Sequence, residues 1–237
     1  MRKVISLQHV NCETPGLIEE ALKSKSYSVE SIQSFRGQPV PKDLGAASGL
    51  VVMGGPMGVY EFARFPFLRD EMRLIERTLR EEKPVLGVCL GSQLLAGTLG
   101  SAVGKGPHKE IGWYPVMLTE SSSDDPLLKA ANRSFMAYHW HGDAFGVPAG
   151  ATSLASSART ACQGFRYGRN AYGFLFHMEI TPEILNGMLS AFGEELEEEQ
   201  ISADAIRQQA AEHLSRLQTV GRLVFEGWAG LLDAAPA

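Results

Sequence analysis

The fold of this 237-residue chain is decided by the stretch Pro84-Val-Leu-Gly-Val88, which runs straight into Cys89-Leu-Gly-Ser-Gln-Leu-Leu-Ala96. The first part is a short apolar run, typical of a buried parallel strand, and the second part has a helical apolar pattern. A strand that passes into a helix at a nucleophilic residue, with a glycine two positions before and after it, is the pattern of a nucleophile elbow. The positive end of the helix dipole would then lie beneath the Cys89 sulfur and favour its thiolate form.

The segments before this stretch predict more of the same layered unit. Gly49–Met53 is a second short apolar run that ends in glycines, and residues 67–82 carry apolar side chains at helical spacing. Strand, helix and strand with short connections form a βαβ unit, which implies parallel strands. Val4–Leu7 predicts a first strand and Leu17–Lys25 a helix after it. The chain is therefore expected to have an α/β fold.

The later part of the chain predicts short, closely spaced strands and then helices. The strand candidates, which would extend the sheet in an antiparallel manner, are Tyr114–Leu118, Phe135–His139, Thr152–Ser156, Gln163–Tyr167 and Tyr172–His177. The glutamates within residues 194–199 predict a solvated helix face. Apolar residues then recur at steps of three and four from Ile206 to Leu231. This predicts a long amphipathic helix that packs on the domain or, alternatively, offers a surface to a partner.

Composition and charge exclude several classes of protein. The chain is 44% hydrophobic, and a disordered chain would be less apolar. Its formal net charge is −5, whereas a nucleic-acid-binding surface normally has an excess of basic residues. No apolar run approaches the ~18 residues that a membrane span needs. The start of the chain does not have the pattern of a secretory signal, so a cytoplasmic protein is expected. The cysteines at positions 12, 89 and 162 match no zinc pattern and are expected to be free thiols.

A candidate general base follows the last predicted strand, in Leu175-Phe-His-Met-Glu179. Residues i and i+2 of a strand share a face, so Glu179 can reach His177, fix its tautomer and support its positive charge. Together with Cys89 these residues supply the parts of a Cys-His-Glu triad. The glycine turn at residues 54–56 ends a neighbouring strand at the same edge, where a backbone N–H could act as an oxyanion donor.

Together these motifs resemble those of the class I (triad) glutamine amidotransferases. Gly54-Gly-Pro56, Gly87-Val-Cys-Leu-Gly-Ser-Gln93 and Phe176-His-Met-Glu179 have the order and spacing of that family. Gly54–Tyr60, Glu110–Trp113 and His139–Asp143 are most similar to stand-alone proteins like the GMP synthase glutaminase domain. The resemblance covers roughly residues 4–190.

The resemblance implies a fold and a division of the chain. The fold would be a flavodoxin-like, doubly wound mixed sheet with flanking helices and a C-terminal helical extension. Its active site would lie at the carboxyl ends of the strands. Residues 1–190 would form the class I amidotransferase domain, and residues 191–237 the helical extension packed on it.

The resemblance also implies roles for individual residues. Cys89 would be the nucleophile, His177 the general base and acid, and Glu179 the residue that orients the histidine. The backbone N–H groups of Gly55 and Leu90 would form the oxyanion hole. The reaction would pass through a γ-glutamyl thioester and release ammonia, without a metal or another cofactor.

The implied substrate is glutamine or another γ-glutamyl small molecule. Its ends would contact Gln93 and the backbone of the loop His141-Gly142-Asp143. A complete GMP synthase continues into an ATP-pyrophosphatase domain with a Ser-Gly-Gly phosphate loop, and this sequence contains no such loop. A separate synthetase subunit is therefore one expected partner, and a stand-alone γ-glutamyl peptidase or hydrolase is the alternative.

Two further classes of function stay open at this point. One is a regulatory module that keeps the fold without catalysis. The other is a metalloprotein in which His139, His141, His177 and Glu179 are counted as four ligands. No nucleic acid and no membrane is expected as a partner, and a homodimer is left open.

Overall fold

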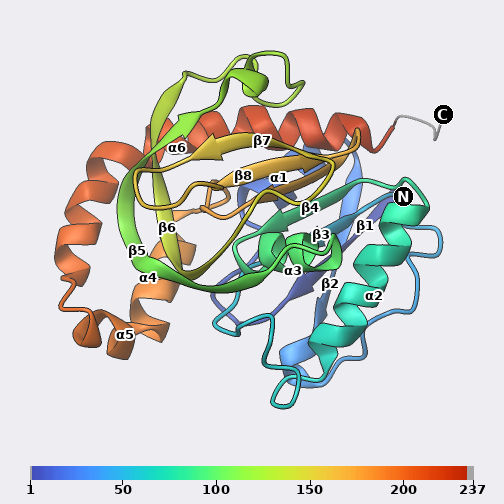
Figure 1. The fold of residues 1–237 in the computed structure, drawn as a ribbon, viewed down its shortest axis with the longest axis horizontal. Coiled ribbons are helices and arrows are strands. Elements are labelled where there is room, and N and C mark those ends of the chain that lie inside the picture. The colour runs from blue at the N-terminus through green and yellow to red at the C-terminus, as the bar shows by residue number, and fades with distance from the viewer. Residues whose placement is uncertain (1, 234–237) are drawn as a thin grey trace.

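One mixed nine-stranded sheet organises residues 2–233, the part of the chain that the computed structural model describes (Figure 1). The strand order is β2-β1-β3-β4-β9-β8-β7-β5-β6. The parallel half consists of β2 (Tyr27–Gln33), β1 (Arg2–Gln8), β3 (Leu50–Val52), β4 (Val85–Val88) and β9 (Ala171–Phe174). The antiparallel half consists of β8 (Gly164–Tyr167), β7 (Ala151–Ser156), β5 (Val103–Leu118) and β6 (Ser134–Phe145). The predicted flavodoxin-like, doubly wound mixed sheet is confirmed.

Helices cover both faces of the sheet, and each face has its own hydrophobic core. The first core lies under α1 (Leu17–Ser24), α4 (Pro182–Ala191), α5 (Gly193–Glu198) and α6 (Ala203–Leu231). The second lies under α2 (Phe67–Arg80) and α3 (Leu90–Thr98). Val4 belongs to the first core and Ile5 to the second, because successive side chains of a strand point to opposite faces. Two 3-10 helices, η1 (Ser34–Arg36) and η2 (Glu120–Ser123), lie in connections.

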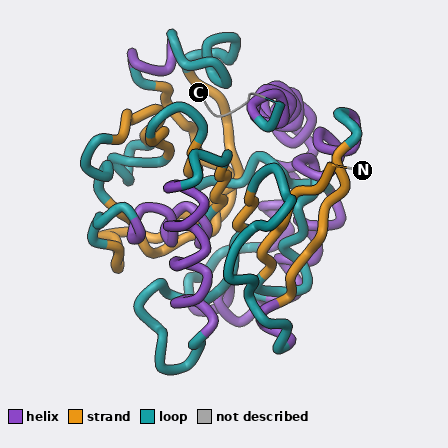
Figure 2. The backbone as a smooth tube through the Cα atoms, turned by 90° about the vertical axis from the view of Figure 1, so that its right-hand side faces the viewer, coloured by secondary structure: helices purple, strands orange, loops and turns teal. Residues whose placement is uncertain are grey.

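The long helix α6 packs along the domain, as the apolar repeat predicts. It contacts α1 and the strands β5 and β6, and it buries Trp228 and Leu217 completely. Ser202 caps its first turn by accepting a hydrogen bond from the Ala205 N–H at 3.2 Å. The helix crosses the top of Figure 1 and is seen nearly along its axis in Figure 2. Among the described helices, none is both long enough and apolar enough to cross a bilayer.

Three sequence-based predictions about strands need correction. The strand β2 is not predicted, because Tyr27–Gln33 is a mostly polar segment at the sheet edge that pairs only with β1. The strands β5 and β6 are much longer than predicted, since their mutual pairing continues through polar residues. The strand β9 ends at Phe174, and His177 instead forms an isolated bridge with Tyr138 of β6.

Candidate active site

The candidate site lies where the parallel strands end. Because β1, β3, β4 and β9 run in the same direction, the segments that follow them meet at one edge of the sheet. Glu13 follows β1 and Gly55 follows β3. Cys89 follows β4 and His177 follows β9. Glu13, Gly55 and Cys89 line one cavity of about 280 Å³, slightly below the usual range for small-molecule sites.

The turn at Cys89 has the geometry of a nucleophile elbow. Cys89 stands between β4 and α3 with φ of 49°, a left-handed backbone conformation that side chains other than glycine rarely adopt. A Cβ on Gly91 would collide with the Val52 carbonyl, and a Cβ on Gly87 would collide with the Gly91 backbone. The two glycines therefore allow α3 to pack directly on β3 and β4, which fixes the thiol at the start of the helix.

His177 and Glu179 form a buried pair. Nδ1 of His177 lies 2.7 Å from Oε1 of Glu179, and both side chains are fully buried. The backbone N–H of His177 donates to the Tyr138 carbonyl at 2.8 Å, which anchors this segment to β6. Nε2 of His177 has no hydrogen-bond partner among the described residues, so it is the ring nitrogen left to exchange a proton.

Charges in the site favour a proton on His177. Burial alone would lower the pKa of His177, but the Glu179 carboxylate and the neighbouring Cys89 raise it well above its usual value. Burial raises the pKa of the Cys89 thiol, while His177 and the Leu90 N–H act in the opposite direction. The thiolate therefore depends on the imidazolium beside it. With its proton, the Cys89 sulfur donates to the Trp140 carbonyl at 3.5 Å.

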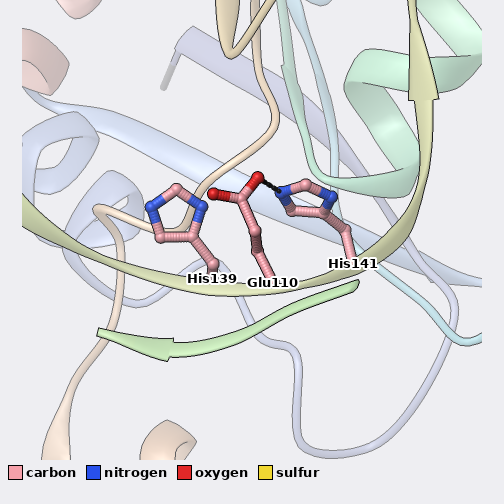
Figure 3. A group of neighbouring side chains, drawn as sticks. All are labelled: Glu110, His139 and His141. Carbon is pink, nitrogen blue, oxygen red and sulfur yellow. Dashed lines mark ion pairs between the residues drawn. The ribbon is translucent and has the colours of Figure 1, made fainter. Parts of the chain in front are cut away.

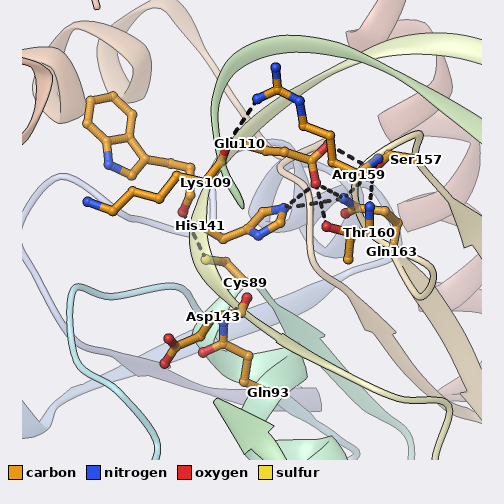
Figure 4. Close-up of polar contacts among 11 residues, drawn as sticks. Cys89, Gln93, Lys109, Glu110, His141, Asp143, Ser157, Arg159, Thr160 and Gln163 are labelled. Carbon is orange, nitrogen blue, oxygen red and sulfur yellow. Dashed lines mark hydrogen bonds and ion pairs between the residues drawn. The ribbon is translucent and has the colours of Figure 1, made fainter. Parts of the chain in front are cut away.

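The residues predicted to bind substrate surround the same cavity, but their side chains differ in direction. Gln93 donates its amide to the Asp143 carbonyl at 3.3 Å, so it braces the loop that also lines the cavity (Figure 4). The His141 ring points away from the cavity toward Glu110, with Nε2 3.5 Å from its carboxylate. The His141 side chain is almost completely buried, and His141 and Gly142 both line the cavity.

The structure does not bring together the four residues that the alternative metalloprotein interpretation counts as ligands. His139 and His141 cluster with Glu110, not with His177 and Glu179 (Figure 3). Their ligand atoms lie within 4.8 Å of one another. The Glu110 carboxylate, however, already accepts hydrogen bonds from Ser157, Thr160 and Gln163 at 2.8, 2.6 and 2.8 Å. A metal ion there would have to share a carboxylate that already accepts hydrogen bonds on both of its oxygens.

Sequence reasoning missed several acidic residues in the cavity wall, Glu61 among them, and two of these, Glu13 and Glu195, contact other parts of the site. Glu13 is buried, and its Oε2 has no hydrogen-bond partner in the described chain. A Cβ on Gly54 would collide with that oxygen and lie 3.2 Å from Cε1 of His177, so Glu13 and His177 flank the same glycine. The position of Glu13, five residues after the end of a parallel strand, is a signal that could have identified it.

The second of these two residues is Glu195, at the start of α5. Its carboxylate accepts hydrogen bonds from Lys109 and from the Trp140 indole N–H, both at 2.8 Å. The segment 194–199 is therefore only partly a solvated face, since Glu195 also lines the cavity. Nothing in the local sequence separates Glu195 from the neighbouring glutamates, because its partners come from β5 and β6.

Comparisons with known proteins point to one family. The sequence matches the class-I glutamine amidotransferase family over residues 13–194. The glutamine amidotransferase-like protein YfeJ of Salmonella typhimurium is 34% identical over 195 residues, which are 81% of this chain and 82% of that protein. A subunit of the glutamine-hydrolysing GMP synthase of Ignicoccus hospitalis is 32% identical over 142 residues, 59% of this chain and 71% of that protein. A glutamine amidotransferase structure from Thermotoga maritima superposes with a TM-score of 0.88 at 33% identity, covering 96% of this chain and 98% of the other.

Proposed function

Because the chain belongs to the class-I glutamine amidotransferase family, we propose that it hydrolyses the γ-amide of glutamine, or a γ-glutamyl amide bond, through a thioester on Cys89. The observation that carries this proposal is the buried pair of His177 and Glu179, 2.7 Å apart, beside a cysteine in a strained elbow. Such a pair supplies the base, its orientation and its charge, which a thiol nucleophile needs.

The first half of the proposed reaction acylates the enzyme. The Cys89 thiolate attacks the γ-carbonyl carbon, and a C–S bond forms. The negative charge on the carbonyl oxygen is stabilised by the N–H groups of Gly55 and Leu90. His177 then gives its proton to the leaving nitrogen, the C–N bond breaks, and ammonia or an amine departs.

The second half returns the enzyme to its starting state. Neutral His177 takes a proton from water, and the hydroxide attacks the thioester carbon. The C–S bond breaks, the γ-carboxyl group is released and loses its proton to solvent, and Cys89 leaves as a thiolate beside protonated His177. Glu179 carries no bond to substrate at any step. It holds the ring in one tautomer and stabilises the charge that His177 gains.

Two settings for this chemistry can be distinguished. In the first, the chain is the glutaminase component that serves a separate synthetase, and the likeness to part of a GMP synthase supports this setting. In the second, it acts alone on γ-glutamyl amides or peptides, and the charged residues Lys105, Glu61 and Asp143 in the cavity wall would contact a leaving group larger than ammonia.

The test is release of ammonia or amine by the purified protein. Glutamine is compared with a panel of γ-glutamyl amides and γ-glutamyl dipeptides, each with and without a candidate synthetase partner. Turnover of glutamine that rises with the partner supports the first setting, and faster turnover of larger γ-glutamyl compounds without a partner supports the second. Absence of turnover on every compound, with and without the partner, would contradict the proposed function.

A further inference from the structure

A second buried histidine–carboxylate pair lies behind the glycine turn of the site. His9, directly after β1, is buried and its Nδ1 lies 3.0 Å from the Gly54 carbonyl oxygen. Its Nε2 lies 2.7 Å from Oε2 of Glu71, a fully buried residue of α2. Ser34 donates its hydroxyl to the other oxygen of Glu71 at 2.8 Å. The proposed hydrolysis gives this pair no role, although three separate segments contribute to it.

The hydrogen bond to Gly54 determines which way the next N–H points. A carbonyl oxygen only accepts, so Nδ1 of His9 carries the proton and donates it. The peptide between Gly54 and Gly55 is planar and trans, as is every peptide among the described residues. Its C=O and N–H groups therefore point in opposite directions. With the carbonyl held toward His9, the Gly55 N–H points away from it, on the side of the cavity that Gly55 lines with Cys89.

Two glycines in succession would not keep this orientation by themselves. Glycine adopts conformations on both sides of the φ map at little cost, so a Gly-Gly peptide can rotate into its flipped form. The packing is also close, since a Cβ on Gly55 would lie 2.6 Å from Cβ of His9. The Gly55 N–H donates to no protein group in the described chain, so it is free to meet a ligand.

We propose that His9, braced by Glu71, is a positioning residue that fixes the Gly54–Gly55 peptide so that the Gly55 N–H faces the oxyanion of the reaction. This inference rests on the proposed function, because an oxyanion forms only if Cys89 attacks a carbonyl. Burial lowers the pKa of His9, but Glu71 and the Gly54 carbonyl raise it overall, which favours the protonated ring. Glu71 thus holds the orientation of the ring through Nε2, and His9 supplies the donor from Nδ1.

The experiment compares two variants that leave no unpaired buried charge. The double variant His9→Leu/Glu71→Leu removes the pair together, since removing His9 alone would strand a buried carboxylate. The single variant Glu71→Gln keeps the donor, because the glutamine amide can donate to Nε2 and leave the proton on Nδ1. Deletion of an oxyanion donor costs about 10²–10³ in kcat, and a donor that is loosened rather than deleted is expected to cost on the order of 10–10².

We expect the double variant to lose kcat by that factor with KM nearly unchanged, and Glu71→Gln to stay within about threefold of the wild type. A second readout separates positioning from general damage. Glutamate γ-semialdehyde, which forms a tetrahedral adduct with a thiolate, should bind the double variant more weakly by a similar factor, whereas the product glutamate should bind equally well. Alkylation of Cys89 by iodoacetamide should keep its rate.

Two outcomes would overturn the inference. A folded double variant with wild-type kcat and wild-type affinity for the semialdehyde would show that the pair does not position the peptide. A Glu71→Gln variant as impaired as the double variant would show that the Nδ1 donor is not what matters. A wild-type protein that neither turns over γ-glutamyl compounds nor binds the semialdehyde would instead overturn the proposed function, and this inference with it.

Discussion

Nδ1 of His177 lies 2.7 Å from Oε1 of Glu179, and the two side chains are completely enclosed by protein. The carboxylate can only accept, so Nδ1 carries the proton and Nε2 is left to exchange one with Cys89 or substrate. Enclosure makes the pair sensitive to charge, because a buried imidazolium needs a nearby anion.

Glu179→Gln tests that dependence on charge. The change keeps the size of the side chain but removes the negative charge that stabilises protonated His177. A thiolate is more nucleophilic than a serine hydroxyl, so the loss should be milder than the ~10⁴ known for an orienting carboxylate in a serine triad. We expect kcat to fall on the order of 10–10³ while KM changes little. Steady-state ammonia release measures both constants, and an unchanged kcat in a folded variant would reduce Glu179 to a structural partner.

Glu13 should give the protein a pH-dependent stability. Burial raises the pKa of Glu13 from 4.5 to about 7, and nearby Glu179 adds to this effect while His177 opposes it. Between these pH values the folded state binds the proton and the unfolded state has lost it. The free energy of unfolding therefore falls as pH rises through this window, by an amount on the order of 1–3 kcal/mol at pH above about 7.

The variant Glu13→Gln removes this penalty, because an amide does not ionise. Its stability relative to the wild type should increase as pH rises from about 4.5 to 7 and then level off. Urea unfolding at a series of pH values measures the difference, and Glu226→Gln on the exposed side of α6 is the surface control. A difference that stays constant over the whole range would mean that Glu13 is not held protonated by its surroundings.

Glu195 should affect substrate binding more than chemistry. It joins Lys109 and Trp140 at the cavity wall, whereas Glu199 contacts Lys109 at 2.9 Å but does not line the cavity. We expect Glu195→Ala to raise KM by about 3–10-fold with little change in kcat. This is the pattern for a group that stabilises the bound substrate and the transition state equally. Glu199→Ala is the matched control and should leave both constants unchanged. Equal effects of the two variants would contradict a specific role for Glu195.

The glycines of α3 offer a direct test of the elbow packing. A Cβ on Gly91 would collide with the Val52 carbonyl, whereas a Cβ on Gly97 would meet Met72 at 3.4 Å and Val59 at 3.6 Å, which are ordinary contacts. We expect Gly91→Ala to lower the free energy of unfolding by about 2–4 kcal/mol or to prevent folding. Gly97→Ala should be neutral or stabilise by up to about 1 kcal/mol, because alanine favours helix. Equal stability of the two variants would show that α3 does not need close contact with β3.

The parts of the site that could be predicted from sequence are those encoded in short, contiguous motifs. The elbow at Cys89 follows from a strand, two glycines and a helix that are adjacent in the chain. The proximity of His177 and Glu179 follows from their spacing of two residues. The strand predicted to carry His177 nevertheless ends at Phe174 in the structure. The long helix α6 can be predicted from sequence because its apolar repeat continues over many helical turns.

The parts that could not be predicted depend on contacts between distant segments. Glu195 reaches the cavity because α5 places it against Lys109 of β5 and Trp140 of β6, and neither its residue type nor its neighbours signal this. The role we propose for His9 depends on Glu71, which is 62 residues away in the chain. The division at residue 190 stays a prediction, and Phe192 and Glu195, just beyond it, line the cavity.

The proposed reaction depends on covalent chemistry at Cys89, and the most direct measurement is peptide mass mapping of protein quenched in acid during turnover of glutamine. We predict a γ-glutamyl group on the peptide that contains Cys89, and none on the peptides of Cys12 or Cys162. The variant Cys89→Ala should fold, release no ammonia and carry no such group. A γ-glutamyl group found on another residue, or glutaminase activity that persists in Cys89→Ala, would contradict the proposed reaction.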